Sequence, residues 1–356
     1  MPAAPTRPLS SPQPLALSLP NAMHELRRCP LTDRWTVIAP SRVRRPDVFV
    51  FDAEVDEESF DPFLAGNESS TPHEILAYRG DGSSANGPGW TTRVVPNKFP
   101  ALSVDGQLEP RGVGLYDRMN GIGAHEVIIE SPDREERMSR LPAGRVRDTL
   151  AAYRDRLADL KHDRRLVHAT IFKNCGPLAG ATLDHTHSQL IALPVVPESI
   201  ERELSQSQAH YEARGRCLLA DIVDQELDDG SRVVVDTPNF IAFCPFASRF
   251  PFEHWIVPKA QESHYESLNP KRLDELGALL KNTLARMDAA LGQPAFNYVL
   301  HTAPFTSSAL PSYRWHFEVF PRLSRTAGFE WGTGYTICTV PPEDAAKFLR
   351  EVEVEG

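Results

Sequence analysis

One strand–helix–strand pattern occurs twice along this chain of 356 residues, and the repetition limits the fold more than any other feature. In the first copy Glu126 precedes His187 by 61 residues, with an amphipathic segment between them. In the second copy Glu253 precedes His316 by 63 residues. Self-similarity at a nearly constant spacing is typical of repeated structural units. A duplicated unit is the simplest account, and chance similarity of two such runs is the alternative.

Short apolar strands alternate with amphipathic helices in both copies. Apolar residues at helical spacing predict one helix over 143–161 and another over 272–291. Apolar runs bounded by turn residues predict strands over residues 35–39, 92–95, 126–130, 169–172 and 188–193, and then over 240–244, 254–257, 295–300 and 316–320. The sequence therefore predicts an α+β fold of two fused repeats, each an antiparallel sheet with covering helices.

The chain divides into three segments. Residues 1–22 are rich in Pro and Ser, carry a single charge at Arg7 and lack the cationic start and apolar stretch of a signal peptide. We expect them to form a disordered extension. We expect residues 23–197 to form the N-terminal repeat with the active site, and residues 198–356 to form the C-terminal repeat.

Composition disfavours several classes of partner. The formal net charge of -10 disfavours binding to nucleic-acid backbones or anionic membranes, and no apolar run reaches the roughly 18 residues that cross a bilayer. The five cysteines are scattered and never form a C-x-x-C pair, which disfavours a disulfide framework and a complete zinc knuckle. We expect a soluble cytoplasmic protein without nucleic-acid or membrane partners.

The run His185-Thr186-His187-Ser188-Gln189 is the strongest chemical signal. On a strand, its two histidines and its glutamine share one face. The preceding residues 174–182 are mostly small, and the backbone N–H groups of such a loop can approach an anion closely. A histidine beside a phosphate cradle predicts a covalent phosphohistidine intermediate. A metal-ligand pair and a structural pair of histidines are the alternatives.

This run, preceded by Asn174-x-Gly176 and Gly180-Ala181-Thr182, resembles the active-site signature of the galactose-1-phosphate uridylyltransferase family. That family is the transferase branch of the histidine-triad superfamily. Residues 29–35, 39–46, 95–100 and 328–335 also resemble family motifs, and the match covers nearly everything after Met23. Within the family, the sequence is similar to the ADP-glucose phosphorylase-like subgroup. The resemblance implies two histidine-triad-like repeats.

The resemblance also implies a ping-pong nucleotidyl transfer. His187 would attack the α-phosphorus of a nucleoside-diphosphate sugar, release the sugar 1-phosphate and hold the nucleotide until a second phosphate acceptor arrives. Gln189 donates hydrogen bonds to the nucleotidyl group without activating water. The remaining substrate-binding positions implied by the resemblance are Arg42, Arg45, Asn97, Asn174, Gly180, Thr182 and His185. A solvated basic turn is the alternative for the two arginines.

Relatives carry zinc sites whose ligands are largely absent from this sequence. At the N-terminal zinc position this chain has Asp61, Leu64, Arg134 and His185, which cannot form a tetrahedral zinc cage. A second cage is replaced by Cys217, Ala220, Gln261 and Arg314. A different family site corresponds to Glu203, His301, His316 and Glu318, which could still bind a divalent ion. The chemistry itself is expected to need no cofactor.

The nucleotide is less strongly indicated than the chemistry. UDP-glucose with galactose 1-phosphate is the default substrate pair, and an adenylyltransferase or ADP-sugar phosphorylase is the alternative, because the run with Thr186 and Ser188 is similar to the adenylyl-transferring branch. Thr336 and Pro342 occupy places where uridylyltransferases present Glu and Gln to the sugar. A histidine-triad hydrolase and a non-catalytic nucleotide-binding protein are further alternatives. The resemblance implies a homodimer.

Overall fold

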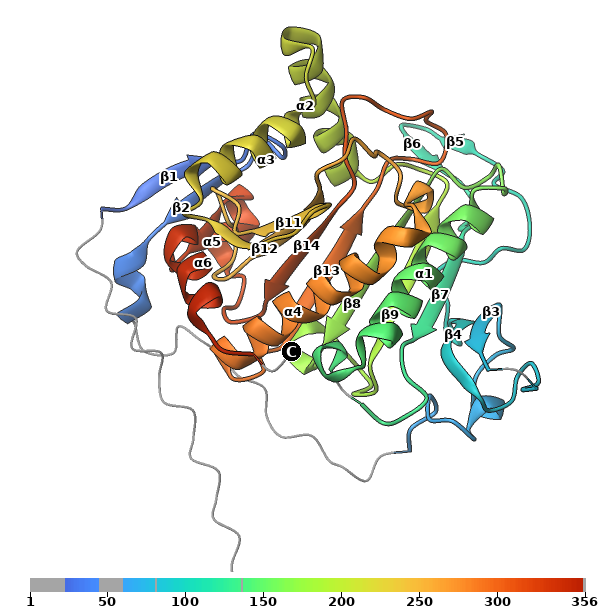
Figure 1. The fold of residues 1–356 in the computed structure, drawn as a ribbon. Coiled ribbons are helices and arrows are strands. Elements are labelled where there is room, and N and C mark those ends of the chain that lie inside the picture. Colours follow the sequence, from blue (N-terminus) through green and yellow to red (C-terminus); the bar gives the residue numbers. More distant parts are fainter. Residues whose placement is uncertain (1–22, 45–59, 81, 136, 355–356) are drawn as a thin grey trace, which may run out of the picture.

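The computed structural model describes residues 23–44, 60–80, 82–135 and 137–354. Its centre is a ten-stranded sheet in which every neighbouring pair is antiparallel (Figure 1). In spatial order the strands are β10 (Val233–Asp236), β11 (Phe240–Phe243), β12 (His254–Pro258), β14 (His316–Pro321), β13 (Phe296–His301), β8 (His168–Cys175), β9 (His187–Leu193), β7 (Ala124–Ile129), β4 (Trp90–Pro96) and β3 (Leu76–Arg79).

The sheet consists of two five-stranded halves that repeat one topology. The order β3-β4-β7-β9-β8 in the first half corresponds to β10-β11-β12-β14-β13 in the second, and β8 pairs with β13 where the halves meet. Phe172 lies opposite Val299 in that central pair, which places a pseudo-twofold axis between them. The predicted α+β fold with two repeats is therefore confirmed, and the repeats join edge to edge in one continuous sheet.

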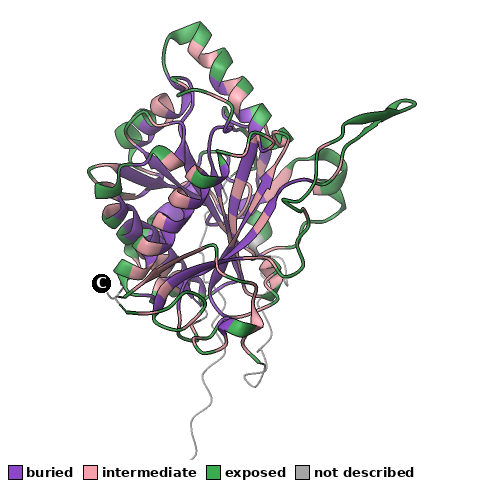
Figure 2. Cartoon of the chain, turned by 90° about the vertical axis from the view of Figure 1, so that its right-hand side faces the viewer, coloured by how far each residue is buried: buried purple, intermediate pink, exposed green. Residues whose placement is uncertain are grey.

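Helices α1 (Ala143–Leu160) and α4 (Leu273–Leu291) lie side by side over one face of the sheet (Figure 1). The sheet is largely buried (Figure 2). Apolar side chains of both helices are buried against it, and each contributes about 1.5–3 kcal/mol on burial. A Cβ at Gly277 of α4 would lie 3.1 Å from the backbone nitrogen of Arg147 in α1, so glycine permits the close approach of the two helices. Helix α6 (Pro342–Glu351) packs beside α4 and β10.

The opposite face is covered in two places. Over the second half lie α2 (Glu198–Arg214), α3 (Leu218–Asp229) and a small sheet of β1 (Glu25–Arg28), β2 (Trp35–Ile38) and β15 (Thr336–Cys338). Leu31 packs there with Leu219, Trp255 and Val257, so the start of the described chain covers the C-terminal half. Over the first half, Phe63 packs on a small cluster of β4 and β7 side chains.

The remaining elements are short. Strands β5 (Arg111–Val113) and β6 (Tyr116–Arg118) form a separate exposed hairpin, and α5 (Gly328–Thr333) buries none of its residues. One-turn 3₁₀ helices span Pro40–Arg44, Glu68–Ser70, Met138–Arg140, Pro177–Ala179, Tyr265–Ser267 and Pro270–Arg272.

Each of the predicted strands and helices is present, with ends that differ by a few residues. The predicted extension, residues 1–22, lies outside the described residues. Within the part of the chain that is described, none of the helices combines the length and apolarity needed to span a bilayer.

Candidate active site

His187 begins strand β9 and is the buried centre of the candidate active site, with 7% of its surface exposed. Its Nδ1 atom donates a 2.7 Å hydrogen bond to the backbone carbonyl of His185, which leaves the lone pair on Nε2. Phe63 lies edge-on to the imidazole, with 5.3 Å between ring centroids. Burial, with a smaller contribution from Lys173, lowers the pKa of His187 to about 4. The imidazole is therefore neutral near pH 7, its nucleophilic form.

Gln189 lies two residues further along β9, on the same face as His187. Its Oε1 atom accepts a 2.8 Å hydrogen bond from Nε2 of His125, because the backbone N–H of Ala101 donates to Nδ1 of that ring. Asn97 Nδ2 lies 3.2 Å from the same Nε2 atom. With its oxygen engaged, Gln189 has its NH₂ group available to donate to a ligand. Sequence reasoning missed His125, whose partner Gln189 is 64 residues away.

The small-residue loop after β8 is held in place by the second repeat. Gly176 and Gly180 have φ angles of 83° and 88°, which favour glycine. Asn297 of β13 donates to Oδ1 of Asn174 at 2.8 Å and to the carbonyl of Ala179 at 2.9 Å. Continuing the β8–β9 register by two residues brings Asn174 opposite His187. Asn297 was also missed, because its role depends on the contact between β8 and β13.

The opposite face of β9 carries a buried polar network that fixes the strand. Nζ of Lys173 donates to Glu130 at 2.6 Å, to Thr186 at 2.9 Å and to the carbonyl of His187 at 2.9 Å. Lys173 and Glu130 are both almost completely buried, so their pairing compensates the cost of removing two charges from water. The alternation of a strand predicts that Thr186 faces away from His187, but it does not identify Lys173 and Glu130 as the partners of Thr186.

The other predicted substrate-binding residues have varied positions. Gly180 and Thr182 are exposed in the loop before β9, and no described side chain bonds to the Thr182 hydroxyl. Arg42 is exposed just after β2, which covers the second half of the sheet, and among the described residues it makes no contact with His187. Arg45 lies outside the described residues.

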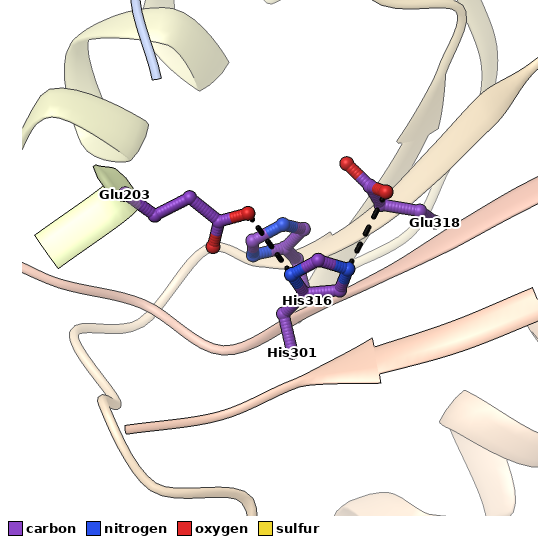
Figure 3. A group of neighbouring side chains, drawn as sticks. All are labelled: Glu203, His301, His316 and Glu318. Carbon is purple, nitrogen blue, oxygen red and sulfur yellow. Dashed lines mark ion pairs between the residues drawn. The ribbon is translucent and has the colours of Figure 1, made fainter. Parts of the chain in front are cut away.

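The second repeat holds a buried cluster of four side chains (Figure 3). His316 begins strand β14 as His187 begins the corresponding strand β9, so the cluster lies at the position of the first repeat's active site. Glu203 comes from α2, His301 from the end of β13, and His316 and Glu318 from β14. Their ligand atoms all lie within 4.8 Å of one another. Nδ1 of His316 lies 3.3 Å from the carbonyl of Arg314, in the same arrangement as His187 and His185.

Cationic side chains lie beside both carboxylates of this cluster. His301 lies 3.0 Å from Glu203 and 3.3 Å from Glu318. Although burial disfavours the imidazolium, these carboxylates raise the pKa of His301 to about 10. Arg249 donates to Glu318 at 2.6 Å. Nε2 of His316 is buried and has no hydrogen-bond partner among the described residues. Two imidazoles and two carboxylates fit a divalent ion, which would displace the His301 proton.

Hydrogen bonds within the protein occupy the positions at which the family resemblance implied zinc ligands. Nδ1 of His185 lies 2.7 Å from Oδ2 of Asp61, and its Nε2 lies 2.8 Å from the carbonyl of Ser131. Leu64 and Arg134 have no atoms that ligate zinc. At the second cage, the guanidinium of Arg314 donates to Oε1 of Gln261 at 3.2 Å and to the carbonyl of Pro258 at 3.1 Å, and Cys217 donates to the Ser312 carbonyl at 3.3 Å.

Comparison with family models gives two adjacent matches. Residues 18–197 match the N-terminal domain of galactose-1-phosphate uridyl transferase, and residues 203–348 match its C-terminal domain.

Curated relatives match over nearly the whole chain. ADP-glucose phosphorylase of Arabidopsis thaliana is 35% identical over 95% of both chains. Galactose-1-phosphate uridylyltransferase of Thermotoga maritima is 27% identical over 94% of this chain and 100% of its own.

Solved structures show the same similarity. An ADP-glucose phosphorylase from Arabidopsis thaliana with bound ADP-glucose has a TM-score of 0.80 and 33% identity over 93% of this chain and 100% of that one. A uridylyltransferase structure has a TM-score of 0.72 and 27% identity over 92% and 97% of the two chains.

Proposed function

Because the chain belongs to the galactose-1-phosphate uridylyltransferase family, we propose that it transfers a nucleoside monophosphate through a covalent intermediate on His187. The donor is a nucleoside-diphosphate sugar and the acceptor carries a phosphate group. The observation that carries this proposal is the bond from His187 Nδ1 to the His185 carbonyl, which leaves Nε2 as a neutral nucleophile on the Gln189 face.

In the first half-reaction, Nε2 of His187 attacks the α-phosphorus and the bond to the bridging oxygen breaks, so the sugar 1-phosphate leaves with the electron pair. The Nδ1 bond to the His185 carbonyl stabilises the positive charge that the imidazole gains. In the second half-reaction, a phosphate oxygen of the acceptor attacks the same phosphorus and the N–P bond breaks. Neither step requires a general base at position 189, because the amide of Gln189 neither gives nor takes a proton near pH 7.

We favour ADP-glucose as the donor, with inorganic phosphate as the acceptor. The higher identity to an ADP-glucose phosphorylase, 35% against 27%, supports this choice over the uridylyl pair. UDP-glucose with galactose 1-phosphate is the second candidate, because the family models carry that name.

Mass spectrometry of the intact protein tests the proposal. The protein is incubated in parallel with ADP-glucose and UDP-glucose, and the expected result is a mass increase of one AMP with the first donor. Added phosphate should then remove the adduct and release ADP. A UMP adduct that only galactose 1-phosphate removes would favour the second candidate. Release of free AMP into water, followed by ³¹P NMR, would indicate a hydrolase, and no adduct with either donor would contradict covalent transfer.

The cluster of Glu203, His301, His316 and Glu318 would hold a divalent ion as a cross-link between α2, β13 and β14. Bound there, the ion would supply structural stability, and the nucleotidyl transfer itself proceeds without it. We further propose a homodimer, which light scattering at several protein concentrations would test.

A further inference from the structure

The side chain of His185 is held at both of its nitrogen atoms. Its Nε2 lies 2.8 Å from the carbonyl of Ser131, and a carbonyl oxygen only accepts, so Nε2 carries a hydrogen. Its Nδ1 lies 2.7 Å from the Asp61 carboxylate, so a proton is shared between these two groups. Only 3% of His185 is exposed. This ring therefore has a single orientation.

Asp61 also fixes the segment that covers His187. Its Oδ1 atom accepts a hydrogen bond of 2.9 Å from the backbone N–H of Phe63, while its backbone carbonyl accepts one of 2.8 Å from Asn67 Nδ2. The ring of Phe63 lies edge-on to both histidines, at 5.9 Å from His185 and 5.3 Å from His187. One carboxylate thus joins the covering segment to the strand that carries the nucleophile.

The path from Asp61 to the nucleophile is short. Asp61 holds the ring of His185, and the carbonyl of His185 is the acceptor that fixes the tautomer and orientation of His187. In the second repeat the corresponding residue is Arg314, which is held by Gln261 and by the Pro258 carbonyl. There the carbonyl of Arg314 is 3.3 Å from His316, against 2.7 Å in the first repeat.

We propose that Asp61 is the positioning residue of the nucleophile, because its bond to His185 fixes the residue whose carbonyl holds His187. This inference rests on the proposed covalent transfer through His187. It predicts that loss of the carboxylate slows formation of the nucleotidyl adduct, because Nε2 of His187 is then aimed less well at phosphorus. Affinity for the donor should change little, since Asp61 contacts the histidine and the covering segment.

Single-turnover adduct formation with ADP-glucose and with UDP-glucose, combined with donor affinity, tests this role. In Asp61→Ala the rate should fall by about 10- to 100-fold, as is typical when the partner of a site histidine is removed. The dissociation constant of the donor should stay within about twofold. In Asp61→Asn the amide can donate to Nδ1 of a neutral His185 that still donates to Ser131, so this conservative variant should recover most of the rate.

Asp133→Ala is the matched control, because Asp133 is exposed two residues after Ser131, and it should react at the wild-type rate. Equal rates in Asp61→Ala and the wild type, or a loss confined to donor affinity, would overturn the inference. If Asp61→Ala does not fold, Asp61→Asn decides: an unchanged affinity with a modest loss of rate supports the role, and weakened donor binding at the wild-type rate contradicts it. A wild-type protein that forms no adduct with either donor would contradict the proposed function instead.

Discussion

At the scale of single residues, His187 and His316 occupy corresponding positions with different surroundings. Both point Nδ1 at the carbonyl two residues earlier, at 2.7 and 3.3 Å. Beside His187 lies the amide of Gln189, whereas His316 stacks on His301 at 4.7 Å between ring centroids and has carboxylates nearby. A phosphate group would meet the like charge of Glu318 there, which costs on the order of 1 kcal/mol or more.

We therefore predict that each chain carries at most one nucleotidyl adduct, on His187. His187→Ala should lose nearly all transfer activity, because removing a covalent nucleophile costs orders of magnitude in rate. His316→Ala is the matched variant in the other repeat and should lose less. Peptide mapping after saturation with the donor gives the measurement. Two adducts per chain, an adduct on His316, or more than about a tenth of the activity left in His187→Ala would contradict this assignment.

A second residue-scale prediction concerns acid stability. Burial lowers the pKa of His168, His187 and His254 to about 4 each. Between pH 4 and 6.5 the unfolded chain binds protons that the folded chain does not, so the free energy of unfolding falls as pH decreases through that range. Three such groups give a slope of at most about 4 kcal/mol per pH unit.

Urea unfolding midpoints at about pH 7 and pH 5 measure this effect. The variant His254→Leu removes one of the three groups and should lose less stability on acidification than the wild type. An equal or steeper loss in His254→Leu would show that the buried histidines are not the cause.

Sequence reasoning identified His187 and Gln189 on one face of a strand because the alternation of a strand is local, but His185, predicted on the same strand, lies just before β9 begins at His187. It missed His125, Asn297 and the pair of Lys173 with Glu130, because these residues act through partners 43 to 123 positions away along the chain. A pattern within one strand carries no information about which distant strand will lie beside it.

At the scale of elements, the contact between α1 and α4 depends on Gly277. We predict that Gly277→Val lowers the free energy of unfolding by about 1–3 kcal/mol, because its side chain must push the two helices apart. Gly144→Ala in the first turn of α1 is the control, since no atom of the described part of the chain lies within 4 Å of its added Cβ. Urea denaturation should show an unchanged or higher midpoint for this control. A neutral Gly277→Val would mean that the helices adapt without cost.

The cluster of Glu203, His301, His316 and Glu318 is a candidate metal site that would join three elements, because its side chains come from α2, β13 and β14. We predict at most one divalent ion per chain and no tightly bound zinc beside Asp61. Elemental analysis of the wild type and of Glu203→Gln measures this, since the neutral amide weakens the cluster. Two zinc ions per chain, or metal that persists in Glu203→Gln and disappears in Asp61→Ala, would contradict the prediction.

Both long helices and the four inner strands of each repeat could be predicted because their apolar patterns are strong, whereas the outer strands β3 and β10 were missed. Helices α2 and α3 were not predicted. Helix α2 is largely polar, and only Ile200, Glu203 and Ser207 are buried along it. Strand β15 was missed for a different reason. It has three residues and exists through its pairing with β2, 300 positions earlier.

At the scale of the whole molecule, a single hydrophobic core connects both repeats. The largest buried cluster contains side chains of α1, α4 and strands from both halves, and the start of the described chain packs on the second half. We predict one cooperative thermal transition, with equal calorimetric and van't Hoff enthalpies. Differential scanning calorimetry measures this. Two separated transitions would show that the segments 23–197 and 198–356 unfold independently.

The pseudo-twofold axis between Phe172 and Val299 also bears on how such a chain can evolve. Away from the axis, a substitution in one repeat leaves the surroundings of its counterpart in the other repeat unchanged. One repeat can therefore retain its chemistry while the other diverges, and Glu318 in place of Gln189 illustrates this. On the axis the two counterparts, Phe172 and Val299, are direct neighbours, so a substitution of either residue changes the surroundings of the other. Selection therefore acts on these two positions as a pair, and they should co-vary when the rest of the two halves drift apart.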